Sequence, residues 1–348
     1  MTSSPANARP FLALEPQELE AEVVRLGGRP FHARVARREV LARGVLDYAR
    51  MSALPAGLRA ALARELPILA GEQLERVVSS DRTTKLLIGF EGKDRLRGVE
   101  TVHIPPRDPA SPKGATLCVS TQVGCPVACP FCASGKAGLL RNLQPHEILE
   151  QFVRGRAIGP LARAVVMGIG EPLLNYASLA RALDTVHDEM GLGARKVTVS
   201  TVGFPERLRR IAPAKPRFQP AISLHTPDDE QRARLVPAMA GTPIEEVLAA
   251  GDDWFAHTGR EVTYEYVLLA GENDTPGHAR RLAARLAGRR ATVNLIPFNP
   301  VEGSEFERPS EEAVERFERI LAAGGLVATV RWSRGVESAA ACGQLRVR

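Results

Sequence analysis

Residues 116–132 read TLCVSTQVGCPVACPFC, an apolar, β-branched run followed at once by a cysteine-rich loop. The run predicts a strand, and Cys125, Cys129 and Cys132 follow it with the spacing C-x3-C-x2-C. Two prolines and the short spacing bring the three sulfurs together on one loop. Three thiolates can hold three irons of a cubic iron–sulfur cluster and leave the fourth iron free to bind a substrate or cofactor.

A zinc site is the main alternative for these three cysteines. Structural zinc sites usually carry a fourth Cys or His at short range. The nearest downstream histidine, His146, lies in a segment that reads as the start of a helix. Three buried structural cysteines are a further alternative, which the prolines and the close spacing disfavour. The pattern therefore favours an iron–sulfur cluster.

Length, hydrophobicity and cysteine use place the chain among globular proteins of a reducing compartment. It has 348 residues, of which 44% are hydrophobic, which is enough for a sizeable core in one or two domains. We find neither a run of about 18 apolar residues nor a signal peptide. Five cysteines without such a signal favour the cytoplasm. We expect a cytoplasmic protein without a membrane partner.

The charge of the chain favours a polyanionic partner. The net charge is +6 and the isoelectric point is near 9.3. Basic residues cluster at 34–38, 95–97 and 207–217, and the last cluster brackets the proline-rich loop IAPAKPRFQP, which could present charge to phosphates. A solvated surface explains each cluster equally well when it is taken alone.

The residue patterns divide the chain into three parts. Residues 1–80 are expected to form a small helical accessory domain, because Pro and Gly separate three amphipathic stretches at residues 16–27, 33–51 and 55–66. Residues 81–114 are expected to form a linking β-hairpin, with TKLLIGF and RLRGVETVHI joined by EGKD. Residues 115–348 then carry the catalytic domain.

Strands and helices alternate through residues 115–348. Apolar, β-branched runs begin this pattern six times, at residues 116–123, 164–169, 196–203, 220–225, 261–269 and 292–299. A terminal helix and strand at 310–325 and 326–333 complete it. A full TIM barrel has eight strand–helix units and about 250 residues. We therefore predict an α/β fold, a partial (βα)6 TIM-like barrel with the small helical N-terminal domain.

Candidate site residues follow the ends of these strands, where barrels of this type gather their chemistry. The string MGIGEP follows the second strand, and SLH and PFN end the fourth and sixth. MGIGEP alone could be an ordinary turn, and His225 alone could be a core histidine. Strand ends that meet at one edge of the barrel favour a binding site, whose candidates are Gly170, Glu171, Ser200, Ser223, His225 and Asn299.

Two cysteines stand outside the cluster loop. Cys118 lies within the first strand and Cys342 lies in the string AAACGQL near the C-terminus. A buried free cysteine is usually a small hydrophobic residue. Cys342, however, lies among small residues and glycine, which predicts an accessible loop and a reactive thiolate. Cys118 precedes the first cluster ligand by seven residues, so we expect its side chain near the same mouth.

The motifs taken together resemble the RlmN/Cfr family of radical S-adenosylmethionine RNA methyltransferases, from about residue 20 to the end. The resemblance is carried by VETVHIP, LCVSTQVGC, CPFCASGKAGLLRNL, MGIGEPLLN, SLHTPDDEQR, YEYVLL, NLIPFNP and ACGQL. It implies a partial barrel, a [4Fe-4S] cluster on the three loop cysteines, and S-adenosylmethionine bound at the open iron. It also implies that the six strand-end residues named above and Leu224 contact this cofactor, and that the helical domain at residues 1–80 binds RNA.

The resemblance also implies a task for each remaining cysteine. Cys342 would take a methyl group from one S-adenosylmethionine, and a second molecule, cleaved at the cluster, would yield a 5′-deoxyadenosyl radical that removes hydrogen from that methyl group. The resulting thiomethylene radical would add to an adenine carbon. Cys118 would release the product and leave a transient Cys118–Cys342 disulfide. Glu100 matches a candidate proton acceptor, and the sequence leaves open whether Glu100 or Cys118 takes the proton.

The resemblance implies C2 of the peptidyl-transferase-centre adenosine of 23S rRNA as the target, with tRNA as a second candidate substrate. The alternative is C8 of the same adenosine, as in the Cfr branch, which confers antibiotic resistance. Glu337 and Ser338 replace the usual Asp-Ile of the family, a departure that bears on the substrate more than on the reaction. A zinc-stabilised RNA-binding protein and a radical enzyme for a small molecule are further alternatives. We expect a monomer reduced by an electron donor such as flavodoxin.

Overall fold

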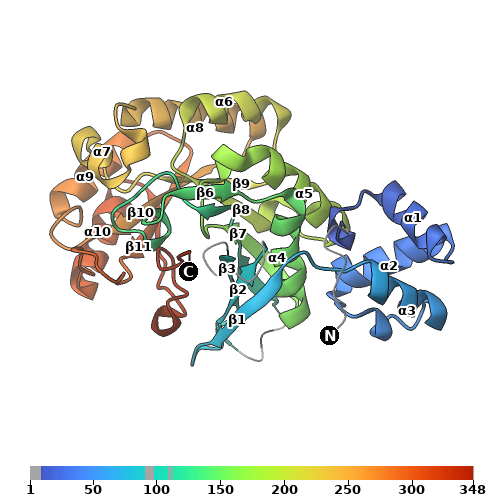
Figure 1. Ribbon diagram of the computed structural model, residues 1–348. Coiled ribbons are helices and arrows are strands. Elements are labelled where there is room, and N and C mark those ends of the chain that lie inside the picture. The colour runs from blue at the N-terminus through green and yellow to red at the C-terminus, as the bar shows by residue number, and fades with distance from the viewer. Residues whose placement is uncertain (1–8, 91–97, 109–110, 112, 348) are drawn as a thin grey trace.

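A computed structural model describes residues 9–90, 98–108, 111 and 113–347. Its main sheet has ten strands in the order β1-β2-β3-β4-β7-β8-β9-β10-β11-β12, and a second sheet pairs β5 with β6. In Figure 1 the helices α4 to α10 surround the strands, while α1, α2 and α3 form a group beside α4 and α5. The site described below lies at the carboxyl ends of the parallel strands.

The N-terminal helices are α1 (Pro16–Arg25), α2 (Pro30–Arg43) and α3 (Ala56–Glu65). Proline at the first position of α1 and α2 presets the helical backbone without losing a hydrogen bond. Gly44 ends α2 with φ +69°, and a Cβ atom there would lie 2.7 Å from the backbone of Ala157 in α4. The glycine therefore lets the helical region pack closely against the barrel.

Three antiparallel strands join this helical region to the barrel: β1 (Glu72–Val78), β2 (Thr84–Gly89) and β3 (Gly98–Ile104). The predicted pairing of TKLLIGF with VETVHI is confirmed, whereas the predicted turn EGKD lies outside the described residues. The assignment of residues 72–78 to a helical part was wrong. This strand is a charged edge strand without regular apolar alternation, so its sequence gave no strand signal.

The barrel strands run parallel from β4 to β12. They are β4 (Ala115–Cys118), β7 (Leu161–Val166), β8 (Val197–Thr201), β9 (Gln219–Ser223), β10 (Val262–Leu268), β11 (Ala291–Pro297) and β12 (Val327–Val330). The strand order is open, with β1 and β12 at its two ends. The predicted partial TIM-like barrel is therefore confirmed, with β12 as the strand expected after the sixth unit.

Helices cover the outer side of this sheet (Figure 1). They are α4 (Pro145–Ile158), α5 (Tyr176–Glu189), α6 (Pro205–Ile211), α7 (Asp229–Leu235), α8 (Ile244–Thr258), α9 (Pro276–Leu286) and α10 (Glu311–Ala323). In α10, Val314, Phe317 and Leu321 recur at helical spacing and are all buried. Ser310 caps the helix by accepting a hydrogen bond from the amide of Ala313.

The chain leaves the main sheet directly after Cys118. The single strand that the sequence predicts over 116–123 is two strands, β4 and β5 (Gln122–Gly124), and β5 pairs antiparallel with β6 (Leu139–Asn142). The loop between β5 and β6 carries the three clustered cysteines. A second small sheet therefore fixes both ends of the cysteine loop.

The C-terminal tail, residues 331–347, crosses from β12 to the other end of the sheet. The Arg334 side chain lies 3.0 Å from the carboxylate of Asp81, and the Ala339 carbonyl accepts a hydrogen bond from Lys85 Nζ at 3.0 Å. Further along, the Arg346 amide donates to Glu100 Oε2 at 2.9 Å. These contacts lie on both sides of Cys342 in the sequence and hold it across the mouth of the barrel.

Asp81 anchors this tail through the side chain of Arg334 and the amide of Gly335. Its carboxylate accepts hydrogen bonds from the amides of Thr83 and Gly335 and from Arg334, which outweigh burial and lower its pKa to about 2. We expect Asp81→Asn to weaken tail docking by about 1 kcal/mol. Limited proteolysis within residues 331–347 should then be about fivefold faster. The exposed control Glu305→Gln should leave cleavage unchanged, and equal rates for the two variants would contradict this role of Asp81.

Candidate active site

Two cavities meet at Cys342. The cysteine-loop cavity, with a volume of about 140 Å³, is lined by Cys125, Cys129, Cys132, Gly170, Glu171, Ser200, Ser223, His225, Glu265, Asn299 and others. The tail cavity, with a volume of about 230 Å³, is lined by Cys118, Arg331, Trp332 and neighbouring residues. Both cavities include Met167, Ile296, Cys342 and Leu345 in their walls. Cys342 can therefore meet one molecule in each cavity.

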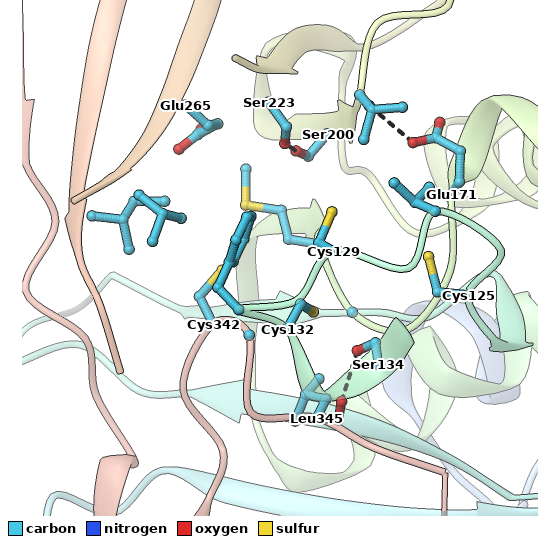
Figure 2. Close-up of a pocket in the computed structure, with 18 of the residues that line it drawn as sticks. Cys125, Cys129, Cys132, Ser134, Glu171, Ser200, Ser223, Glu265, Cys342 and Leu345 are labelled. Atoms are coloured by element: carbon cyan, nitrogen blue, oxygen red, sulfur yellow. Dashed lines mark hydrogen bonds between the residues drawn. The ribbon is translucent and has the colours of Figure 1, made fainter. Parts of the chain in front are cut away.

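The three loop cysteines face the first cavity, as Figure 2 shows. The turn that places them depends on Gly124, which has φ +79° and would bring a Cβ atom within 1.9 Å of the Gly138 carbonyl oxygen. A backbone hydrogen bond from Cys132 to the Cys129 carbonyl closes the loop at 3.1 Å. The glycine and this turn bring the three thiols to one wall, as the sequence predicts.

The chemistry of these thiols fits a cluster of cations. Burial raises the pKa of Cys125 to about 12 and also raises the pKa of Cys129 and Cys132. Bound iron ions would favour the thiolate forms that burial disfavours. In the described residues no three His, Cys, Asp or Glu side chains gather closely enough to hold a single metal ion. A cubic cluster takes each thiolate at a different corner, so its ligands do not converge on one ion.

The MGIGEP segment places its glycines and glutamate against the same cavity. Gly170 has φ +109°, and a Cβ atom there would lie 2.7 Å from the side chain of Gln122. The Glu171 carboxylate accepts hydrogen bonds from Thr201 Oγ1 at 2.6 Å and from the amides of Leu173 and Val202 at 2.9 Å each. Burial nevertheless raises the pKa of Glu171. The segment is therefore a constrained, close-packed strand end.

Three further strand ends bring predicted residues to this cavity. Ser200 Oγ and Ser223 Oγ lie 3.3 Å apart, and Asn299 Nδ2 donates to the Cys342 carbonyl at 3.0 Å. His225 has the left-handed φ of +65°, and its Nδ1 accepts a hydrogen bond from the Val267 amide at 3.1 Å. Burial lowers the pKa of His225 to about 3, so its ring is neutral.

Leu224 is the predicted contact that the structure does not bring to the cavity wall. Its side chain is fully buried, and its amide donates to the Glu265 carbonyl at 3.0 Å. The remaining strand-end candidates all line the cysteine-loop cavity. The predicted strand ends thus meet at one cavity, while the lining of that cavity depends on how the chain turns after each strand.

Glu265 is a cavity residue that the sequence reasoning missed. It lies in β10, its Oε1 accepts a hydrogen bond from Asn294 at 3.0 Å, and its Oε2 has no hydrogen-bond partner within the described residues. Burial raises the pKa of Glu265, although Arg331 lies 3.8 Å from Oε1 and opposes that shift. A lone carboxylate within the apolar strand YEYVLL was the available signal.

Cys118 and Cys342 both face the tail cavity, and both are free cysteines. Cys342 is exposed, as its loop sequence predicts. The predicted thiolate is not its favoured state, because surrounding protein atoms raise the pKa of Cys342 to about 12. Burial likewise raises the pKa of Cys118 to about 11. The disulfide that the sequence resemblance implies is not formed in this structure.

Glu100 lies behind the tail, outside the walls of both cavities. It is fully buried, and Lys85 Nζ lies 3.0 Å from its Oε1. The same lysine holds the Ala339 carbonyl, while Glu100 Oε2 holds the Arg346 amide. This ion pair therefore binds the tail before Cys342, at Ala339, and after it, at Arg346.

Lys85 should be essential for stability because it neutralises a buried carboxylate. We expect Lys85→Met to lower the free energy of unfolding by about 3–5 kcal/mol, since Glu100 would remain buried without its counter-charge. The double variant Lys85→Met/Glu100→Gln should recover much of that loss, because both charges are gone. Denaturant unfolding of the three proteins measures both effects. Equal losses in the single and double variants would contradict this role for the pair.

The cysteine loop, the glycine-bearing strand end and the partial barrel define a radical SAM enzyme, and residues 119–283 match the radical SAM superfamily. The chain is 42% identical to the probable dual-specificity RNA methyltransferase RlmN of Gloeobacter violaceus, over 97% of this chain and 95% of that protein. It is 40% identical to the Parasynechococcus marenigrum protein of the same description, over 95% and 96%. The chain therefore belongs to the RlmN family of RNA methyltransferases, as its motifs predict.

A solved structure agrees with this assignment. A radical SAM methyltransferase from Sphaerobacter thermophilus matches with a TM-score of 0.88 at 40% identity, covering 97% of this chain and 99% of that one. Across the described residues, every helix is too short or too polar to cross a bilayer. The chain is thus a radical SAM RNA methyltransferase, and RNA is its substrate class.

Proposed function

We propose that this enzyme methylates C2 of the peptidyl-transferase-centre adenosine in 23S rRNA, with tRNA as a second substrate. The main support for this proposal is the position of Cys342 between the cysteine-loop cavity and the cavity that contains Cys118. Curated relatives are described as dual-specificity RNA methyltransferases, which supports two kinds of RNA substrate. C8 methylation is the alternative outcome at the same adenosine.

The cysteine-loop cavity would hold the cofactors. Cys125, Cys129 and Cys132 would ligate a [4Fe-4S] cluster, and Gly170, Glu171, Ser200, Ser223, His225 and Asn299 would hold S-adenosylmethionine beside it. When bound, the cluster supplies the electron that cleaves S-adenosylmethionine to a 5′-deoxyadenosyl radical. The cavity walls exclude water from that reactive species. Leu224 would act only through the position of its backbone.

Cys342 would carry the methyl group between the cavities. Its sulfur takes the methyl group from one S-adenosylmethionine by displacement, and a second molecule serves the radical step, so each turnover uses two. Abstraction of hydrogen from the S-methyl group leaves a thiomethylene radical on Cys342. The electrophilic carbon of adenine accepts that radical, although it could not attack a sulfonium itself. The exposed position of Cys342 supports this role.

Cys118 would then release the RNA. The adduct loses a proton and one electron, which the oxidised cluster would take back. The Cys118 thiolate then attacks the Cys342 sulfur, the carbon–sulfur bond breaks as a transient disulfide forms, and the freed carbon takes a proton to become the methyl group. Both sulfurs face the tail cavity, which supports this exchange. Of the two candidate proton acceptors, Cys118 lines the cavity, while Glu100 already holds Lys85 and Arg346. We therefore assign the proton to Cys118 in its thiolate form, which must pass that proton on before its sulfur attacks Cys342.

Mass spectrometry of digested RNA tests the proposal. Total RNA from cells with and without the gene is separated into 23S rRNA and tRNA, and the methyladenosine isomers are resolved from standards. Gene-dependent 2-methyladenosine in both fractions supports the proposal, whereas 8-methyladenosine supports the alternative. We further propose that the enzyme is a cytoplasmic monomer and that residues 1–80 bind RNA. A protein such as flavodoxin would supply its electrons.

A further inference from the structure

We infer that Trp332 is the stacking surface for the target adenine in the tail cavity. This inference rests on the proposed function and assigns a substrate contact within it. Trp332 lies two residues beyond the end of β12, on the tail that carries Cys342. Its side chain is 37% exposed, although it lines the same cavity as Cys118 and Cys342. A base that enters this cavity to reach Cys342 meets the indole ring.

The exposure of Trp332 distinguishes it from a core residue. The chain has two tryptophans, and Trp254 is fully buried against Phe218, with ring centroids 5.2 Å apart. Leaving a large aromatic ring open to water forfeits the free energy gained by burying it. Aromatic rings that line an RNA-binding cavity instead stack on bases, which contribute about 1–3 kcal/mol each. Stacking on RNA is the interaction that the position of Trp332 favours.

Arg308 links this ring to the reacting sulfur. Its guanidinium carbon lies 5.5 Å from the centroid of the Trp332 ring, in cation–π geometry. The same guanidinium lies 3.4 Å from Asn299 Oδ1, and Asn299 Nδ2 donates to the Cys342 carbonyl. Arg308 and Asn299 therefore fix the position of the Trp332 ring relative to Cys342. An adenine stacked on this ring would be positioned relative to Cys342.

The charges around the tail cavity suit a polynucleotide. Arg107, Arg331 and Arg334 all contribute to its walls. Arg334 is paired with Asp81, and Arg331 lies 3.8 Å from Glu265 but keeps a side chain that is 40% exposed. Arg107 is exposed. An extruded base carries its flanking phosphates to the rim of its pocket, where guanidinium groups bind them. Free adenosine and S-adenosylmethionine carry no phosphates for these groups to bind.

Tryptophan fluorescence tests the inference directly. A Trp254→Phe holoenzyme has Trp332 as its remaining tryptophan, so its emission reports on that ring. The probes are a synthetic hairpin of the 23S rRNA sequence around the target adenosine and the same hairpin made abasic at that position, both at saturation by anisotropy. We expect the adenosine hairpin to quench Trp332 emission and the abasic hairpin to leave it unchanged. The abasic hairpin also controls for quenching by the cluster.

Substitution at Trp332 provides a second readout. We expect Trp332→Ala to raise KM for the hairpin at least about fivefold, with unchanged iron content, because one stacked base is lost. Trp332→Phe should retain most of the affinity. Val327→Ala, an exposed apolar change on β12 away from the cavity, is the matched control and should leave KM unchanged.

Three outcomes would overturn this inference alone. Equal quenching by both hairpins would place another base on Trp332, and quenching by S-adenosylmethionine alone would assign the tail cavity to the cofactor. RNA binding and methylation with unchanged Trp332 emission would reject the stacking contact while leaving the proposed function intact. Absence of methylation on any RNA by the wild-type holoenzyme would instead overturn the proposed function, and this inference with it.

Discussion

Cys129→Ala enzyme is expected to purify without its cluster and to produce no methylated RNA. Cys129 is one of three thiols on the wall of the cysteine-loop cavity, between Cys125 and Cys132 in the sequence. Its removal leaves two thiolates, too few to hold three irons of a cubic cluster. Iron should fall from about four per chain in the wild-type protein to near zero. Iron analysis and visible absorption after anaerobic purification measure the loss.

Cys342→Ser is the matched control for this experiment. Its side chain also borders the cysteine-loop cavity, but we assign it to carrying the methyl group. It should keep the iron of the wild-type protein and still produce no methylated RNA. Zinc without iron in the wild-type protein would instead support the zinc-stabilised RNA-binding alternative. Unchanged iron in Cys129→Ala would show that Cys129 is not a cluster ligand.

The barrel was predictable because its signals are local. Each parallel strand is an apolar, β-branched run, and α10 repeats apolar residues at helical spacing. These local residue patterns are enough to identify the strands and the helix. Strand β1 was missed because an edge strand exposes charged side chains and needs no apolar alternation. The helices α6 and α7 have seven residues each, too few to show helical period, so only their place between successive strands predicted them.

In the candidate site, too, some features follow from local sequence and others from contacts between distant segments. The cysteine loop and the strand ends follow from spacing along the chain. The pairing of Lys85 with Glu100 instead depends on the register between β2 and β3. Their hydrogen bonds to the tail depend on where residues 331–347 cross the sheet. The raised pKa of Cys342 is also a property of packing, which a string of small residues does not reveal.

Cys118→Ala is expected to stop turnover at a covalent protein–RNA adduct. The variant keeps Cys342, which can still take a methyl group and join it to adenine, but it lacks the sulfur that faces Cys342 across the tail cavity. Without that nucleophile the carbon–sulfur bond cannot break, and release of methylated RNA should fall by about 10²–10⁴-fold. A radiolabelled hairpin should migrate with the protein on a denaturing gel, and ribonuclease followed by mass spectrometry should place the nucleotide on Cys342.

The double variant Cys118→Ala/Cys342→Ser controls for the attachment point and should give no adduct, since the methyl carrier is gone.

Glu100→Gln separates the two candidate proton acceptors. If Cys118 takes the proton, Glu100→Gln should release methylated RNA without accumulating adduct, whatever stability it loses with its buried ion pair. Adduct accumulation in Glu100→Gln would move that proton to Glu100, and free methylated RNA from Cys118→Ala would remove Cys118 from the reaction.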